Sequence, residues 1–281
     1  MLRDRLEFSE RRACLLVGQH RSTQRHEPPA PSADDCELRA RLREIAKRKP
    51  RWGYRRAHAQ VRQDGHLVNR KRVQRLWREE GLRVPQKTRK RRRSTDPDNK
   101  RLRAERPNEL WALDYEYDQT ADGRMLRLLN IVDEFTREAL AMHVERSITA
   151  DETVSVLEDI VARRGCPANL RCDNGPELTA HALRDWCAGA DVTTRYIEPG
   201  SPWENPFAES FNARVRDELL NLEEFSCLAE AKVLTEDWKI AYNAEHLHSS
   251  LGYRSPDAFA AAWGPSDGRM TPLGEDRARM A

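Results

Sequence analysis

Three acidic residues stand where their carboxylates could bind a divalent metal ion together. Asp114 lies in the alternating segment WALDYEYD, Asp173 follows ANLRC, and Glu209 lies in ENPFAESFN. A carboxylate within a strand is costly to bury unless it is paired or binds metal. Each acid also fits an ordinary role: a solvent-facing position on an edge strand for Asp114, an Asx turn for Asp173, and a solvated amphipathic helix for Glu209. Their chemistry therefore depends on whether the fold brings them together.

The elements that must position these acids follow an α/β pattern. WALDYEYD, RLLNIVDEF and EALAMHV are expected to be three strands, the first two joined by a D-G hairpin turn. Thr149 and Glu152 form a capping box for a helix that Gly165 closes. ANLRC, a helix over 179–188, VTTRYI, and two helices over 206–221 and 229–244 complete the order. The pattern predicts a mixed five-stranded sheet with helices on both faces.

The start of the helix at 206 decides where Glu209 points. A start at Ser201 would place Pro206 inside the helix, where its ring clashes with a carbonyl, so we favour Asn205 as the N-cap with Pro206 at the first helical position. Glu209 then lies in the first turn, with Asn212 and Arg216 along the same face.

Charge divides the chain into a basic and an acidic half. Residues 1–110 hold 32 lysines and arginines against 15 acids, whereas residues 111–281 hold 17 against 31. A charge of +17 over 110 residues favours a nucleic-acid partner over a merely solvated surface.

Helical periodicity in the basic half predicts a small all-α unit over residues 36–84. Its third helix starts at Asn69, a good N-cap, and stops at Gly81. The expected DNA contacts are Arg70, Lys71, Arg72 and Arg75 on this helix, Arg55 and Arg56 before it, and Arg91, Arg92 and Arg93 in the linker. The rival interpretation is a merely soluble helical bundle, which the clustering of basic residues at one helix start disfavours.

These patterns give five expected segments. They are a loosely ordered N-terminal segment over 1–35, a DNA-binding unit over 36–84, a basic linker over 85–107, an α/β core over 108–265 and a tail over 266–281. No apolar run of the ~20 residues needed to cross a bilayer occurs, and no secretory signal is recognisable. We therefore expect no membrane partner and a bacterial cytoplasmic, nucleoid-associated protein. The six cysteines have neither C-x-x-C nor zinc-ligand spacing, so we expect no structural zinc.

In combination, the acids and their surrounding motifs resemble a known family. Thirty-five residues separate Asp173 from Glu209, a spacing similar to the D-D-35-E core of retroviral integrases and bacterial transposases. WALDY, LLNIVDEFTRE, RCDNGPEL, IEPGSPWEN, AESFN, RDELLN and WKIAYN with HSSLGYRSPDAF resemble the second-reading-frame product of the IS-three family of insertion sequences. The resemblance covers about residues 10–262.

The resemblance implies a ribonuclease-H-like fold preceded by a helix-turn-helix domain. It implies a DNA transposase that binds terminal inverted repeats and catalyses strand cleavage and transfer, with Asp114, Asp173 and Glu209 as catalytic metal ligands and Asn212 and Arg216 near the DNA. Two Mg²⁺ ions, replaceable by Mn²⁺, would hold the attacking and leaving oxygens of phosphoryl transfer. The implied partners are terminal and target DNA, an upstream-frame product joined by frameshifting, and further copies of the chain on DNA.

Several residues depart from the family pattern. Pro206 and Ala213 stand where glycine is usual, Cys172 replaces a serine or histidine, and His246 stands where an arginine is usual. Pro206 and His246 motivate an alternative, a catalytically impaired or repurposed DNA-binding protein derived from a transposase. A two-carboxylate glycosidase would not explain the basic half.

Overall fold

A five-stranded mixed sheet forms the centre of the larger unit. The computed structural model describes residues 8–25, 32–83, 102–175, 178, 180–198, 204–266 and 269–272. The strand order is β3-β2-β1-β4-β5, with β1–β2 and β2–β3 antiparallel and β1–β4 and β4–β5 parallel. The strands are β1 (Leu110–Gln119), β2 (Met125–Asp133), β3 (Ala139–Glu145), β4 (Asn169–Cys172) and β5 (Thr193–Tyr196). The predicted mixed five-stranded sheet is confirmed.

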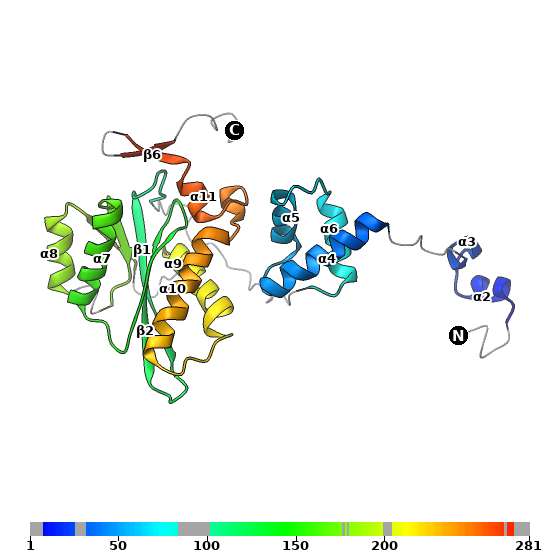
Figure 1. Cartoon of the computed structure of the whole chain (residues 1–281), viewed down its shortest axis with the longest axis horizontal. Helices are drawn as coiled ribbons and strands as arrows, with labels where there is room; N and C mark the ends of the chain where they lie inside the picture. Colours follow the sequence, from blue (N-terminus) through cyan, green and yellow to red (C-terminus); the bar gives the residue numbers. More distant parts are fainter. Residues whose placement is uncertain are drawn as a thin grey trace.

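Helices cover both faces of this sheet, as expected (Figure 1). One face carries α7 (Ala150–Arg164) and α8 (His181–Gly189). The other carries α9 (Pro206–Val215), which continues into the π-helical turn η2 (Arg216–Leu220), and α10 (Leu228–Glu245). The 3₁₀ turn η3 (Ser249–Leu251) and α11 (Pro256–Ala260) follow. None of the helices in the described ranges is long and apolar enough to cross a membrane.

The alternation of side chains along β1 determines which face receives Asp114. Trp111 and Leu113 are fully buried in the apolar cluster beneath α7 and α8. Ala112 belongs to the second cluster, with residues of α9 and α10. Because successive side chains of a strand point to opposite faces, Asp114 shares the face of Ala112 and points toward α9.

Local sequence signals explain the ends of α7. The Thr149 hydroxyl accepts from the backbone N–H of Glu152, and the Glu152 carboxylate accepts from the N–H of Thr149. Gly165 then ends the helix with a φ of 84°, a conformation that glycine adopts without strain. The predicted capping box and stop are both confirmed.

Three helices form the smaller unit, α4 (Ala33–Arg48), α5 (Tyr54–Gln63) and α6 (Arg70–Glu79). They share a buried apolar cluster that includes Leu42 and Val73. The Asn69 side chain caps α6 by accepting from the N–H of Lys71, as predicted. Helix α4 begins at Ala33, before the expected start of this unit at residue 36, because the Ser32 hydroxyl accepts from the N–H of Asp35 and caps an earlier turn.

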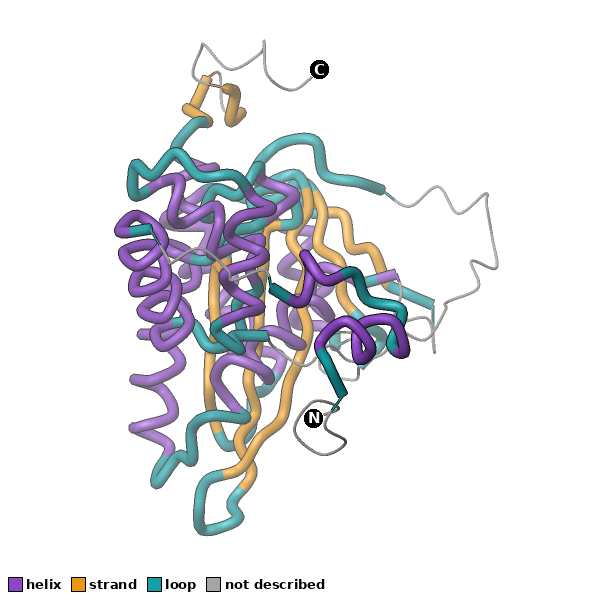
Figure 2. Tube along the Cα trace, turned by 90° about the vertical axis from the view of Figure 1, so that its right-hand side faces the viewer, coloured by secondary structure: helices purple, strands orange, loops and turns teal. Residues whose placement is uncertain are grey.

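The structure also differs from expectation near both ends of the chain. Within the segment expected to be loosely ordered lie α2 (Glu10–Leu16) and α3 (Arg21–Gln24). They form because Ser9 caps α2 and because Glu10 accepts from Arg25 at 2.7 Å. The hairpin of β6 (Trp263–Ser266) and β7 (Arg269–Pro272) crosses the boundary expected at 265/266, and both views place it away from the five-stranded sheet (Figures 1 and 2).

Candidate active site

Asp114 lies in surroundings that disfavour its charged form. Burial raises its pKa to about 6, and the charges of Asp173 and then Glu209 act in the same direction. The hydrogen bond from the backbone N–H of Tyr115 to Asp114 Oδ1, 2.9 Å long, partly offsets this rise. The structure therefore brings both Asp173 and Glu209 within electrostatic reach of Asp114.

Parallel pairing of β1 and β4 explains why Asp173 lies near Asp114. Ala112 pairs with Arg171, and the same register carried two residues further puts Asp173 level with Asp114. Asp173 Oδ1 accepts from the N–H of Gly175 at 3.0 Å, so the residue also makes the Asx turn considered as its ordinary role. That turn orients one carboxylate oxygen and leaves the other for a ligand.

Glu209 reaches the site from the first turn of α9. Asn205 and Pro206 start this helix as predicted, but the Asn205 side chain does not cap it. Instead Asn205, which is 3% exposed, donates from Nδ2 to the carbonyl of Leu113 at 3.2 Å. The amide thus fastens the start of α9 to the strand position preceding Asp114, which sets the distance between Glu209 and that acid.

Two further amides hold the Asp114 carboxylate. Asn212 donates from Nδ2 to Asp114 Oδ2 at 2.9 Å. Asn130, which is 1% exposed on β2, donates to Asn212 Oδ1 at 2.8 Å. Sequence reasoning found Asn212 but missed Asn130, whose register opposite Asp114 in the β1–β2 pair was the signal that could have identified it.

Arg216 lies on the same side of the sheet but pairs with another acid. Its Nε donates to Glu116 Oε1 at 2.9 Å, and a terminal nitrogen donates to the carbonyl of Tyr117 at 2.6 Å. Burial raises the pKa of Glu116 to about 7 although the Arg216 charge opposes the rise. Sequence reasoning did not single out Glu116, which alternation along β1 places on the face of Asp114.

The acids supply only oxygen donors, the ligand type that Mg²⁺ prefers. Mutual repulsion between Asp114 and its two acidic neighbours is what a cation would relieve. Across the described ranges, no group of three acidic, histidine or cysteine side chains is close enough to hold a metal ion. The three carboxylates are thus the right type of ligand for a divalent cation. They would have to move closer together to bind one.

The DNA contacts predicted in the basic half, apart from Arg56, fall into three groups. Arg55, Arg70, Lys71 and Arg75 are exposed. Arg72 is partly buried and donates to Asp34 and Asp35 of α4, and Arg75 also lies 3.4 Å from Asp35. Arg91, Arg92 and Arg93 lie outside the described residues.

Arg56 lies between the three-helix unit and the core. Its Nε donates to the carbonyl of Leu247 at 2.9 Å, and burial lowers its pKa to about 10. His246, which stands where the family usually has arginine, is 4% exposed and stacks on Tyr242. Burial lowers the pKa of His246 to about 4, and the positive charge of Arg56 lowers it further. Arg56 therefore supplies a cation beside the position whose arginine is missing.

Family comparisons agree with this division into two parts. Residues 33–92 match an HTH-like domain, and residues 104–202 and 190–256 match two models of an integrase core domain.

Related insertion-element proteins span nearly the same length. The chain is 39% identical over 261 residues to an uncharacterised 31.7 kDa protein of insertion element IS407 from Burkholderia multivorans, which covers 92% of this chain and 93% of that protein. It is 31% identical over 260 residues to the transposase InsD of an IS2 element from Escherichia coli, covering 85% and 84%.

A solved structure supports the fold alone. The simian T-cell lymphotropic virus intasome, in complex with PP2A regulatory subunit B56 gamma, matches with a TM-score of 0.51 at 15% identity, covering 84% of this chain and 78% of that one. With the integrase core, the HTH-like domain and the insertion-element relatives taken together, the chain belongs to the IS-three family of insertion-sequence transposases.

Proposed function

We propose that this chain binds the terminal inverted repeats of its element and catalyses metal-dependent DNA strand cleavage and strand transfer at Asp114, Asp173 and Glu209. The observation that carries the proposal is the electrostatic coupling of the three acids. Asp114 is mostly buried on β1, and the charges of Asp173 and Glu209 both raise its pKa. The repulsion of Asp114 by two further carboxylates is unfavourable without a cation, so the presence of these acids on three separate elements favours a metal site.

The ion that fits this donor set is Mg²⁺, with Mn²⁺ as a substitute. Asp114, Asp173 and Glu209 would hold two such ions, which neutralise the charge that develops on the transferring phosphoryl group. The chain's own contribution is positioning. Asn212 orients Oδ2 of Asp114, the turn at Gly175 orients Oδ1 of Asp173, and Asn205 anchors the helix that carries Glu209.

DNA would be held mainly by the basic three-helix unit. Arg70 and Lys71, exposed in the first turn of α6, are our candidates for groove contacts. Arg55 and Arg75 are exposed and suit backbone phosphates, whereas Arg72 would have to leave its acidic partners to take part. Arg216 keeps a side chain that is 42% exposed and could meet the terminal DNA beside the acids.

The assembled enzyme, in this proposal, contains more than one copy of the chain on DNA. An upstream-frame product, joined by ribosomal frameshifting, would add a further DNA-binding part. Mass photometry of the frameshift fusion on paired element ends tests the number of copies, because monomers alone would contradict the proposed assembly. Detection of the fused chain by immunoblot of cells that carry the element tests the frameshift, and its absence would contradict the proposed upstream partner.

A strand-cleavage assay tests the catalytic assignment. The full chain, incubated with end-containing duplexes and Mg²⁺, should nick and join DNA, and chelation of the metal should stop both reactions. Asp114→Asn and Glu209→Gln should each lose at least a hundredfold in rate, whereas Asp118→Asn, on the same strand, should retain most of it. Full activity in Asp114→Asn would refute the metal-site assignment. Repeat binding without any metal-dependent nicking would favour the impaired DNA-binding protein.

A further inference from the structure

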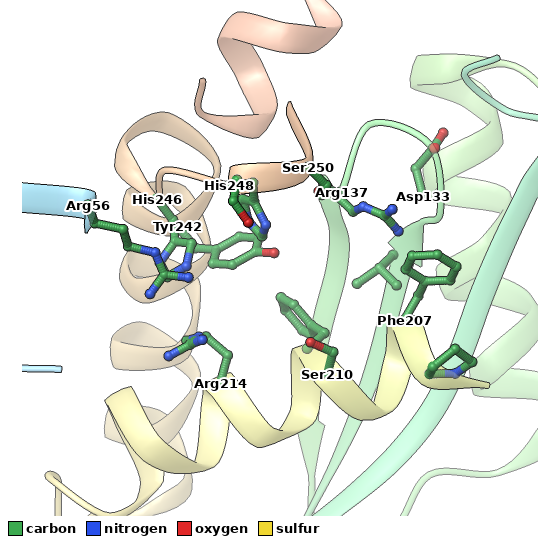
Figure 3. Close-up of a pocket in the computed structure, with 14 residues that line it drawn as sticks. Arg56, Asp133, Arg137, Phe207, Ser210, Arg214, Tyr242, His246, His248 and Ser250 are labelled. Atoms are coloured by element: carbon green, nitrogen blue, oxygen red, sulfur yellow. The ribbon is translucent and has the colours of Figure 1, made fainter. Parts of the chain in front are cut away.

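A pocket of about 470 Å³ lies between the three-helix unit and the core, away from the three acids. Its lining comes from α5, the end of β2 and the turn after it, α9, the end of α10, and η3 (Figure 3). On α9 it is lined by Phe207, Ser210 and Arg214, which lie on the side of the helix turned away from Glu209. The pocket is therefore distinct from the candidate active site.

Three arginines surround this pocket. Arg56, Arg137 and Arg214 approach it from three different elements (Figure 3). Arg214 pairs with Glu218 at 3.1 Å, and Arg56 donates to a backbone carbonyl.

The acid that lines the pocket does not balance these cations. Asp133 is fully buried, accepts from the backbone N–H groups of Asn108, Phe135 and Thr136, and lies 3.4 Å from Arg164. The lining as described thus carries an excess of positive charge.

Two imidazoles at the pocket, those of His246 and His248, each have one ring nitrogen without a hydrogen-bond partner among the described residues. The Nε2 atoms of His246 and His248 are buried and make no hydrogen bond to any described residue. His246 is only 4% exposed, and such a buried polar atom normally has a partner. Burial is the main cause that lowers the pKa of His248 to about 2, and the nearby arginines lower it further. A bound anion would offset that positive field and give both nitrogens an acceptor.

The mouth of the pocket is polar and open. Ser210, Ser249 and Ser250 are exposed and can donate hydroxyl hydrogen bonds. The volume is sufficient for a phosphate with its flanking sugars. One arginine side chain can bind two phosphate oxygens at once through short, charge-assisted hydrogen bonds. The lining therefore matches a phosphate better than a neutral ligand.

We propose that this pocket binds a phosphate of the DNA backbone and so clamps DNA at the junction of the HTH-like unit and the integrase core. The inference rests on the proposed function for its choice of DNA as the source of the phosphate. Because Arg56 comes from one unit and Arg137 and Arg214 come from the other, one phosphate would tie the DNA to both. The pocket would then fix the path of the duplex from the DNA-binding helices toward the acids.

Serine substitutions test the pocket without removing any apolar contact. Ser210→Asp and Ser250→Asp place a negative charge at its mouth from two different elements. Ser210→Asn and Ser250→Asn are neutral controls, and Ser155→Asp makes the same charge change on α7, on the opposite face of the sheet. Circular dichroism confirms folding of each variant before binding is measured.

Affinity for an element-end duplex, measured by fluorescence anisotropy without divalent metal, is the main readout. Both pocket aspartates should bind at least tenfold more weakly than the asparagine variants and Ser155→Asp. Their plot of log affinity against log salt should be shallower by about one, the loss of one phosphate contact. Equal affinity and equal salt dependence in all five variants would overturn the proposal.

Inorganic phosphate separates the two sources of the anion. At fixed ionic strength it should raise the Tm of the parent and of Ser155→Asp relative to chloride, and should raise that of Ser210→Asp less. If this difference occurs while DNA affinity is unchanged, the pocket binds the free ion and the assignment to DNA is wrong. A parent that binds DNA through the pocket but never nicks it refutes the catalytic proposal alone. If Ser210→Asp and Ser250→Asp both bind and nick DNA as well as the parent does, the pocket proposal alone is refuted.

Discussion

The side-chain amide of Asn212 donates a 2.9 Å hydrogen bond to Oδ2 of Asp114 and thereby joins α9 to β1. Asn130 extends the connection, since it donates to Asn212 Oδ1 at 2.8 Å from β2. The carboxylate is thus held by a relay whose last member is 1% exposed and rigidly placed on a central strand. If Asp114 is the metal ligand proposed above, Asn212 acts on the reaction by orienting that carboxylate.

Loss of Asn212 should therefore impair the metal site more than the fold. We expect Asn212→Ala to lower the rate of Mg²⁺-dependent nicking by about 10–100-fold and to raise the metal concentration needed for half-maximal activity. Asn221→Ala, an exposed substitution just after η2, is the matched control and should have little effect. A uniform fall in activity at every metal concentration, with no shift of the half-maximum, would contradict this positioning role.

A buried ion pair next to the sheet provides a stability prediction. Arg171 on β4 and Glu134 after β2 form a salt bridge in which their side chains are 5% and 0% exposed. Arg171→Met should lower the free energy of unfolding by about 3–5 kcal/mol, because it leaves the carboxylate buried without its cation.

The double variant Arg171→Met with Glu134→Met should recover most of that loss in urea denaturation, since no unpaired charge remains. Arg195→Met, on the exposed neighbouring strand β5, is the single-site control. Equal destabilisation of the single and double variants would show that packing, not the lone charge, sets the cost.

The pKa of His248 predicts how one variant responds to pH. In the folded chain this pKa is lowered to about 2, mainly by burial, whereas the unfolded imidazole titrates near its ordinary value of 6.5. Stability from the neutral form is thus complete above pH 6.5 and is lost as pH falls toward the folded pKa. Between pH 6.5 and the folded pKa, the loss is about 1.4 kcal/mol for each pH unit.

His248→Asn removes this titration, so its stability relative to the parent should rise by about 2 kcal/mol between pH 7.5 and pH 5. Urea denaturation of both proteins at each pH measures the difference. Comparison with the parent matters because Asp114 and Glu116 have raised pKa values in the folded chain. Their protonation stabilises the fold of both proteins as pH falls over the same range, which masks the loss caused by His248 in the parent alone. A pH-independent difference would contradict a buried neutral imidazole.

Local signals in the sequence predicted the elements of the fold. Thr149 and Glu152 mark the start of α7 and Gly165 marks its end, each through contacts with nearby residues. Alternation in WALDYEYD identifies both β1 and the face of the sheet on which Asp114 lies. Contacts between distant residues left no such signal. Asn205 looked like an ordinary cap, yet its amide bonds to Leu113 O, 92 residues away.

The same reason explains the position of Arg56. It was expected at a DNA backbone because it is basic and lies on a helix of the DNA-binding unit. In the structure it donates to Leu247 O, 191 residues away, and becomes partly buried at the junction of the two units. Only the tertiary arrangement distinguishes it from the exposed Arg55 beside it.

The junction itself is apolar as well as charged. Leu247, which follows α10 of the core, is 3% exposed and belongs to the buried cluster of the three-helix unit together with Trp52. Lys49 and Glu245 form an ion pair across the same junction at 2.8 Å. The two units should therefore unfold together rather than one after the other.

Leu247→Ala should separate the unfolding of the three-helix unit from that of the core. Truncating a fully buried leucine costs about 2–5 kcal/mol, so we expect calorimetry to resolve two transitions where the parent has one. Leu222→Ala, at a position 52% exposed, should leave a single transition.

The affinity of Leu247→Ala for an element-end duplex should fall little, because the exposed arginines of α6 remain. Its nicking activity should fall markedly, because the bound DNA is no longer aligned with Asp114. A parallel loss of binding and nicking would mean that Leu247 supports the fold of the DNA-binding unit and not its alignment with the active site.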